Sequence, residues 1–246
     1  SAFVAPDRIP YKVLIEGRES LGSLLSNALE LQDQEDARFV IAELLEPLSQ
    51  YSLIRVAPDA DNYTIHRLVQ EVVKAEMDKS ERRLWVERTI AAVTQAFPNT
   101  EYGNWSDCDR LLPHAKVGIQ LATAAQIESK SIALLLARTG YYLSERAQYS
   151  EAEPLHQEAL AMRKRSLGEE HLDVASSLNN LALLYKNQGR YSEAEPLLQE
   201  ALALLEQILG QDHPSTNVVR GNLQGLQERQ NRGKSNLIRW FTDKFR

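Results

Sequence analysis

The chain has 246 residues, 43% of them hydrophobic and 25% charged, and these values are typical of a globular protein. Its formal net charge of -6 argues against a general binder of nucleic acid or of anionic membranes, because both need a positive field. A single cysteine, Cys108, excludes an intramolecular disulfide and fits a reducing, cytoplasmic compartment. The N-terminal residues do not resemble a signal peptide, and the apolar runs are too short to span a membrane.

Residues 1–80 are predicted to form helices at 11–16, 21–29 and 35–48, then a two-stranded hairpin at 53–56 and 63–65, then a helix at 67–77. Helices followed by a short hairpin are typical of a winged-helix domain. Residues 81–127 are expected to add two helices that bridge this domain to the rest of the chain.

Winged helices often bind DNA, so a transcription regulator is one hypothesis for this chain. Residues 1–80 carry eight Lys and Arg against fourteen Asp and Glu. The helix predicted at 35–48 has one Arg and several acidic residues, which would repel phosphates. The composition therefore disfavours DNA as a partner.

The strongest signal is an internal repeat, because residues 147–171 return as residues 189–213 with 15 of 25 positions identical. Each copy is predicted to be the second helix of a helical hairpin, whose first helices lie at 130–146 and 174–187. Gly189 is expected to end the first helix of the second hairpin. Two S-x-x-E pairs, Ser150 with Glu153 and Ser192 with Glu195, predict capping boxes for the second helices.

Further features of the second helices recur with the same offset of 42 residues. A proline, Pro154 or Pro196, is expected near the first turn, where a missing N–H costs least. One stripe of small and apolar residues is predicted to be buried in each copy. In the two copies it consists of Ala152, Leu155 and Ala159, and of Ala194, Leu197 and Ala201.

The pattern G-x-Y-x-E-A followed by A-L resembles the tetratricopeptide repeat. The period of 42, with L-G-x-x-H and N-N-L-A-L-L-Y, is similar to the variant in kinesin light chains and many bacterial signalling proteins. The resemblance implies an α-α superhelical solenoid over residues 128–232, with two good hairpins and a degenerate third that begins at Pro214. The ends of a solenoid are expected to be atypical because they must cap its core.

Residues 233–246 are predicted to form an amphipathic helix. Four apolar residues, Leu237, Trp240, Phe241 and Phe245, share one face of it. We expect this helix to cover the open end of the solenoid. Residues 228–246 carry six basic and two acidic side chains, so a helix on a membrane surface is the alternative.

The front of the chain resembles the winged-helix domain of signalling ATPases of the STAND class (NB-ARC/NACHT-like). The resemblance rests on AFVAPDRIP, LLEPLSQYSLI and TIHRLVQEVV, and FPNTEYGNWSDCDRLLPHA is similar to the link before the repeats of that family. In this class a nucleotide-binding domain precedes the winged helix. The resemblance implies a mainly α fold, a winged-helix domain with a small β-hairpin followed by the repeat solenoid, and a chain that is one piece of a longer protein.

The same resemblance assigns a role to His66, which matches the His of the family's M-H-D motif that touches the β-phosphate of bound ADP. This sequence departs from the motif, since Ile65 replaces Met and Arg67 replaces Asp. The stretch most like a phosphate loop, residues 17–23, lacks the lysine of such loops. We therefore expect no cofactor in this chain and ADP or ATP in the parent protein, with a His packed at a helix start as the alternative role.

Catalytic motifs are absent from the sequence, which has no G-x-S-x-G, H-E-x-x-H, C-x-x-C or Gly-rich dinucleotide loop. Its five histidines are not spaced as metal ligands, and His171 and His213 are repeat copies that packing would explain. We expect neither an enzyme nor a metal site.

Stacked hairpins form a concave groove lined by their first helices. The resemblance places ligand-binding positions in two of these helices: Ser176, Asn179, Asn180, Leu183, Lys186 and Asn187 in one, and Leu134, Ala137, Tyr141, Ser144 and Glu145 in the other. Asn180 matches an Asn that binds a peptide main chain, for which an amide is suited because it donates and accepts. Lys186 is expected to meet an acidic side chain or a C-terminal carboxylate, and helix packing is the alternative role of Asn179 and Asn180.

These observations favour the sensor half of a STAND-type signalling ATPase. Its expected partners are a protein or peptide ligand in the groove and its own upstream nucleotide-binding domain, with no nucleic acid and no membrane. The alternative is a stand-alone adaptor that resembles the cargo-binding module of a kinesin light chain.

Overall fold

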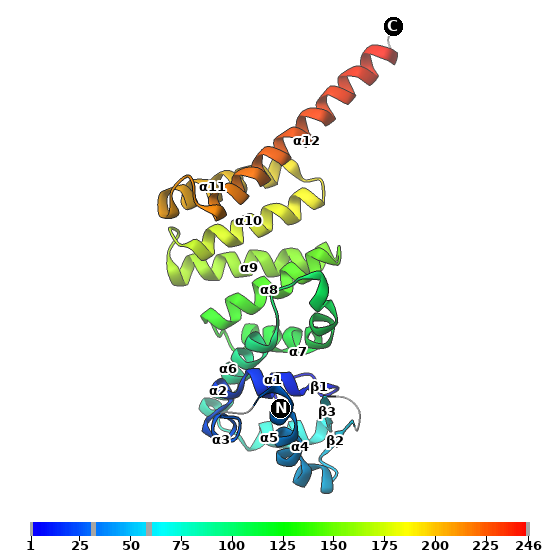
Figure 1. Ribbon diagram of the computed structural model, residues 1–246, viewed down its shortest axis with the longest axis vertical. Helices are drawn as coiled ribbons and strands as arrows, with labels where there is room; N and C mark the ends of the chain where they lie inside the picture. The colour runs from blue at the N-terminus through cyan, green and yellow to red at the C-terminus, as the bar shows by residue number, and fades with distance from the viewer. Residues whose placement is uncertain (1, 31–32, 58–60, 245–246) are drawn as a thin grey trace. The chain divides into compact units, whose positions relative to one another are not determined.

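The computed structural model describes residues 2–30, 33–57 and 61–244, without the side chains of residues 34, 102 and 233–243. The chain divides into two compact units, residues 1–142 and 143–246. The predicted mainly α fold is confirmed, because short strands accompany a long series of helices (Figure 1).

The first unit contains a small sheet among helices. Its elements are β1 (Ile9–Pro10), α1 (Tyr11–Glu16), α2 (Arg18–Leu21), α3 (Ser23–Ala28), α4 (Gln34–Gln50), β2 (Ile54–Val56), β3 (Asn62–Ile65), α5 (Arg67–Glu76), α6 (Lys79–Ala96), the 3-10 turn η1 (Tyr102–Asn104), α7 (Trp105–Ala124) and most of α8 (Lys130–Glu145). The helix predicted at 21–29 is confirmed as α3, but it begins only at Ser23, because Gly22 has a φ of 121° that no α-helix contains.

The predicted hairpin is confirmed as β2 and β3, which pair antiparallel. A third strand, β1, pairs antiparallel with β3 and gives the strand order β1-β3-β2. Ile9 of β1 and its partner Tyr63 are almost fully buried. The sequence did not predict β1 because its two residues, one of them a proline, carry no alternating pattern.

The two expected bridging helices, α6 and α7, pack against each other, and α6 also packs on α1 and α2. Gly17 permits this contact, because a Cβ there would lie 2.3 Å from Cβ of Ala92 on α6. The glycine that begins the stretch compared with a phosphate loop thus serves a close helix contact. The boundaries expected at 80, 127 and 232 stay predictions, and the compact first unit extends to residue 142.

The second unit is a stack of repeat helices, α9 (Tyr149–Leu167), α10 (Leu172–Asn187), α11 (Tyr191–Leu209) and α12 (Pro214–Lys244) (Figure 1). The alanines of the predicted stripe are buried, with Ala152, Ala194 and Ala201 fully inaccessible. The leucines of that stripe, at 155 and 197, are half-buried, and the following residues, His156 and Leu198, occupy the core instead.

The predicted capping boxes of the second helices are wrong. Helices α9 and α11 begin at Tyr149 and Tyr191, and neither start has a side-chain cap. Ser150 and Ser192 therefore lie inside the first turn, and Pro154 and Pro196 fall in the second turn rather than the first. The two glutamates of the pattern contact the next repeat: Glu153 accepts from Arg190, and Glu195 accepts from Gln227.

Histidines cap three helices through the same ring nitrogen. Nδ1 of His171 accepts from the backbone N–H of Asp173 at 3.0 Å, and Nδ1 of His213 accepts from Ser215 at 3.2 Å. Nδ1 of His66 accepts from Leu68 at 3.2 Å at the start of α5. The packing role predicted for His171 and His213 is thus corrected to a capping role, since each satisfies a backbone donor that the helix leaves free.

The degenerate third unit consists of one continuous helix, α12, rather than a hairpin followed by a separate helix. Its residues Asn217, Arg220, Gln224 and Gln227 replace the buried Ala175, Leu178, Ala182 and Tyr185 of α10. The face that packs a second helix in the preceding repeat is therefore polar here, as expected for the end of a solenoid core.

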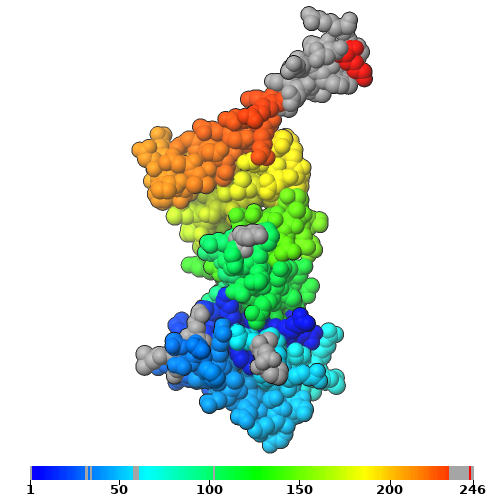
Figure 2. Space-filling model, turned by 45° about the vertical axis from the view of Figure 1, so that its right-hand side comes forward, coloured from blue at the N-terminus to red at the C-terminus, as the bar shows by residue number. Residues whose placement is uncertain are grey.

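The second half of α12 extends beyond the other repeat helices as an arm, which the space-filling view shows up to residue 232 (Figures 1 and 2). The apolar side chains predicted on this segment, at 237, 240, 241 and 245, lie outside the described residues. Among the described residues, no helix is both long and apolar enough to cross a membrane.

Ala147 and Gly189 are repeat equivalents that follow α8 and α10, and both have a positive φ, 56° and 78°. A residue with a Cβ is strained in this conformation, whereas glycine is not. We expect Ala147→Gly to stabilise the second unit and Gly189→Ala to destabilise it, each by about 1 kcal/mol. Thermal unfolding of both variants checks this, and a loss of stability in Ala147→Gly would contradict the strain argument.

His114 on α7 is buried, and its Nε2–H donates to the carbonyl oxygen of Arg8 at 3.3 Å while Nδ1 has no partner among the described residues. Burial lowers its pKa from 6.5, although the backbone hydrogen bonds act in the opposite direction. The unfolded chain therefore binds a proton more readily than the folded one. The contribution of His114 to the free energy of unfolding is therefore fully present above pH 6.5 and is lost as the pH falls below that value.

We expect His114→Gln to reduce the loss of thermal stability between pH 7 and pH 5, because glutamine keeps an N–H donor but does not titrate. The measurement is the difference in Tm between the two pH values for wild type and variant. Equal differences would show that His114 does not contribute to the acid sensitivity.

Candidate ligand groove

Helix α10 has a buried face and an accessible one. Val174, Leu178 and Leu181 are among the residues of its buried face. The predicted ligand positions lie on the accessible face, with Ser176 and Asn187 exposed and the remaining four half-buried. Spacings of three and four residues bring these positions onto one side of a helix.

Two of the predicted ligand residues already have partners within the protein. Oδ1 of Asn179 accepts from Nδ2 of Asn222 on α12 at 2.9 Å, so Asn179 joins two first helices of neighbouring repeats. Oγ of Ser176 donates to the backbone oxygen of Leu172 at 3.0 Å. Asn180 has no hydrogen-bond partner in the part of the chain that the structure describes. The helix-packing role weighed for both asparagines therefore applies to Asn179, while the amide of Asn180 is available to a ligand.

Lys186 lies half-buried near the C-terminal end of α10, and no carboxylate within the described ranges forms an ion pair with it. Burial lowers the pKa of Lys186, and the nearby positive charge of Arg229 lowers it further. A half-buried cation beside a second cation is electrostatically unfavourable without an anion. Within the described ranges, no ion pair therefore balances the charge at this end of α10.

Helix α12 contributes a second wall that the sequence analysis did not assign. The offset of 42 could have found it, since Gly221 and Gly225 are the equivalents of Asn179 and Leu183. A Cβ added at either glycine would meet no atom within 4 Å. Glycine inside a helix costs about 1 kcal/mol relative to alanine, and here no contact among the described residues requires it. At these two positions α12 therefore presents backbone that no side chain covers.

The ligand positions predicted on α8 differ in how far the structure exposes their side chains. Ser144 is buried, and its Oγ lies 3.2 Å from Nε2 of His156, so its assignment to the groove is wrong. Ala137 is also buried, whereas Leu134 and Tyr141 are half-buried in the first unit and Glu145 is exposed in the second. Tyr141 belongs to the first unit and α10 to the second, so a site that joins them stays a prediction. A site of Glu145 with α10 also stays a prediction.

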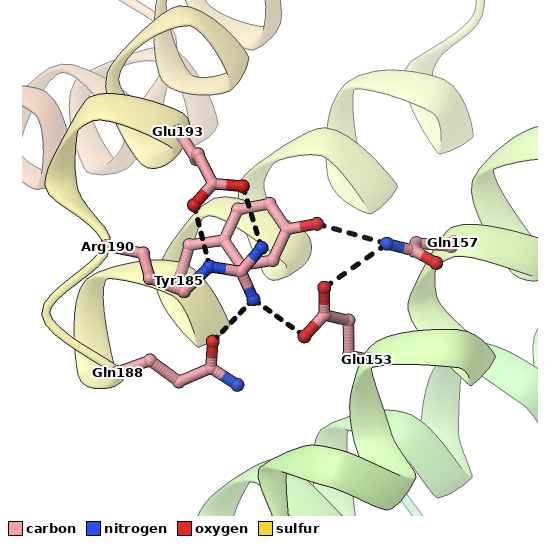
Figure 3. A network of polar contacts seen from close by, with 6 residues as sticks. All are labelled: Glu153, Gln157, Tyr185, Gln188, Arg190 and Glu193. Carbon is pink, nitrogen blue, oxygen red and sulfur yellow. Dashed lines mark hydrogen bonds and ion pairs between the residues drawn. The ribbon is translucent and has the colours of Figure 1, made fainter.

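Next to the groove, Arg190 connects two repeats (Figure 3). Its guanidinium group donates two hydrogen bonds of 2.7 Å to Glu193 and one of 2.7 Å to Glu153 on α9. It also donates to Gln188 and lies 4.0 Å from the ring centroid of Tyr185. Glu193 and Glu153 raise the pKa of Arg190. This network links the turn after α10 to the preceding repeat.

We expect Arg190→Met to lower the Tm of the second unit, because the methionine keeps the apolar stem but removes five donors. The variant Glu153→Gln is expected to have a smaller effect, since Glu193 remains bound to Arg190. The double variant tests the coupling. A Tm loss equal to the sum of the single losses would show that Arg190 and Glu153 do not stabilise each other.

His66 is exposed, with Nδ1 engaged in capping α5, so only Nε2 remains for another partner. It lines a surface pocket together with Ser49, Ser52, Leu53, Ile54, Arg55, Val56 and Thr64. The alternative role, a His at the start of a helix, is confirmed as the N-cap of α5, although the ring is exposed rather than packed. Contact with a nucleotide stays a prediction. Among the described residues, no group of three or more His, Cys, Asp or Glu side chains is placed to hold a metal ion.

Two known families match separate parts of the chain. Residues 135–173 and 174–215 match the tetratricopeptide repeat, which confirms the resemblance of the repeats. Residues 1–82 match a domain of unknown function, DUF7779.

The chain is similar to a nucleotide-binding leucine-rich repeat (NLR)-like protein of Hyaloscypha variabilis. The identity is 31% over 145 residues, which are 58% of this chain and 14% of that protein, so the chain spans a small part of its relative's length. Among solved structures, the crystal structure of BtubC (BKLC) from P. vanneervenii is similar, with 17% identity, a TM-score of 0.48, and 92% of this chain and 88% of that chain covered.

Proposed function

We propose that this chain, with its two tetratricopeptide repeats and its similarity to part of an NLR-like protein, is the regulatory and sensor portion of a STAND-type signalling ATPase. In this proposal it binds a protein or peptide ligand in the groove between α10 and α12. The similarity to an NLR-like protein supports membership in a longer signalling protein. The tetratricopeptide repeats support a role in protein interaction.

The observation that supports the groove best is its open α12 wall. Gly221 and Gly225 leave room for the main chain of a ligand to approach the helix, and a Cβ at either position would meet nothing. On α10, Asn180 offers a donor and an acceptor, which is what an extended peptide main chain requires. Leu183 adds a half-buried apolar contact between Asn180 and Lys186.

The second expected partner is the upstream nucleotide-binding domain of the same protein. The first unit exposes large apolar side chains that a neighbouring domain would cover, among them Phe39, Leu68 and Val72. Under this proposal His66 would contribute Nε2 to a site for ADP or ATP that the parent protein completes. Catalysis is assigned to that parent and not to this chain, and a cytoplasmic location is part of the same proposal.

A stand-alone adaptor that resembles a kinesin light chain module remains the alternative function. The discriminating observation is the full-length gene. A phosphate loop encoded upstream of residue 1 would support the signalling ATPase, and its absence would favour the adaptor.

Filling the groove provides a test that does not depend on weakening the fold. We expect Gly225→Leu to raise the Tm, because leucine favours a helix by nearly 1 kcal/mol over glycine and the site has room. The same variant is expected to lose a ligand captured from native lysate. Gln224→Leu adds the same side chain to the polar face of α12, outside the groove, and is the matched control.

The readout is the set of proteins retained by immobilised wild type and by each variant. A ligand lost by Gly225→Leu and by Asn180→Ala, but kept by Gln224→Leu, would support the groove. A ligand that all variants retain equally would exclude the groove as the binding site.

A further inference from the structure

The first unit contains a small pocket in which none of the predicted site residues lies. Helices α1, α4 and α7 contribute to its wall, together with Asp61 just before β3. Its volume is about 160 Å³. A cavity of about 150 Å³ is large enough to hold benzene. The pocket is therefore suited to a small molecule rather than to a nucleotide or a peptide.

Three basic and three acidic side chains line the pocket among the described residues, and four of the six form ion pairs. Nζ of Lys12 on α1 lies 2.7 Å from Oδ2 of Asp107 on α7. A guanidinium nitrogen of Arg38 on α4 lies 3.2 Å from Oδ2 of Asp61. These two pairs balance each other's charges within the wall of the pocket.

The other two charges of the pocket are Glu16 at the end of α1 and Arg110 on α7. Both are exposed, and neither forms an ion pair or a hydrogen bond within the part of the chain that the structure describes. A purely anionic ligand would meet three carboxylates here, and a purely cationic ligand would meet three basic groups. A ligand that carries one charge of each sign would satisfy both free groups, so the lining favours a zwitterion.

A buried hydroxyl group is also available in the pocket. Tyr11 is 5% exposed and packs on the ring of Tyr63, yet its hydroxyl group forms no hydrogen bond with any described residue. Buried tyrosine hydroxyl groups usually have a partner. Burial raises the pKa of Tyr11, and the negative charge of Asp61 raises it further. The hydroxyl group therefore stays protonated at neutral pH and can donate to a ligand.

We propose that this pocket binds a free amino acid, whose carboxylate pairs with Arg110, whose ammonium group pairs with Glu16, and to which Tyr11 donates a hydrogen bond. The half-buried Ile15 adds an apolar contact to the pocket. A carboxylic acid or an amine alone would leave one of the two free charges unbalanced, and a neutral polyol would leave both. All described residues of the pocket belong to the first unit, so the proposal does not depend on the groove.

The test follows the thermal unfolding of the full chain with each common free amino acid in turn, at about 10 mM. A ligand that binds only the folded state raises the Tm by mass action. We expect at least one amino acid to do so. Its N-acetyl derivative, which lacks the ammonium group, and its amide, which lacks the carboxylate, are expected to raise the Tm less.

Calorimetric titration of the same amino acid then tests the residues. Arg110→Gln, Glu16→Gln and Tyr11→Phe are each expected to weaken binding about tenfold, because each removes a hydrogen bond to a charged group of the ligand. Tyr11→Phe keeps the buried ring and removes a hydroxyl group that has no described partner, so we expect it to fold. The matched controls Glu19→Gln and Arg67→Gln neutralise exposed charges of the first unit outside the pocket and are expected to bind as wild type does.

Three results would overturn the proposal. One is that no free amino acid raises the Tm. Another is that the pocket variants and the matched controls bind the amino acid equally well, which would place the ligand elsewhere. The third is that the N-acetyl derivative or the amide binds as tightly as the free amino acid, because the pocket would then respond to one charge and not to a zwitterion.

Discussion

Close contact between helices in the second unit depends on side chains that are small enough to permit it. Ala152 and Ala159 of α9 and Ala194 and Ala201 of α11 are almost fully buried. An alanine brings little apolar surface of its own, but it allows larger neighbours such as Leu178 to fill the space between helices. Because these contacts occupy one face of each helix, the opposite face of α10 remains accessible.

The repeat was predictable because two segments 42 residues apart share most of their residues. Such an internal repeat indicates a repeated structure more directly than the helix propensity of single residues does. The helices α9, α10 and α11 follow from it nearly to their ends. The capping boxes were not predictable from S-x-x-E, because the same glutamates serve the contact with the next repeat. A glutamate that caps its own helix and a glutamate that contacts the next repeat produce the same sequence pattern.

The groove was predictable in part. The positions on α10 were correct as an accessible face, but Ser144 is buried and pairs with His156, which stands where the second copy has a leucine. The wall on α12 was missed because its glycines bear no resemblance to a binding residue. Only the repeat offset marks Gly221 and Gly225 as candidate ligand positions, because it aligns them with Asn179 and Leu183.

The contacts between repeats have a consequence for how such a protein can lengthen. Glu153 and Glu195 occupy the same position in successive copies, and each meets a polar side chain of the unit that follows. A second copy of the unit that begins at Arg190 would offer its own Arg190 to Glu195, as Arg190 is offered to Glu153 now. The array can therefore grow from its interior by recombination, whereas the polar residues of α12, such as Arg220 and Gln224, do not offer the buried surface that a further helix needs.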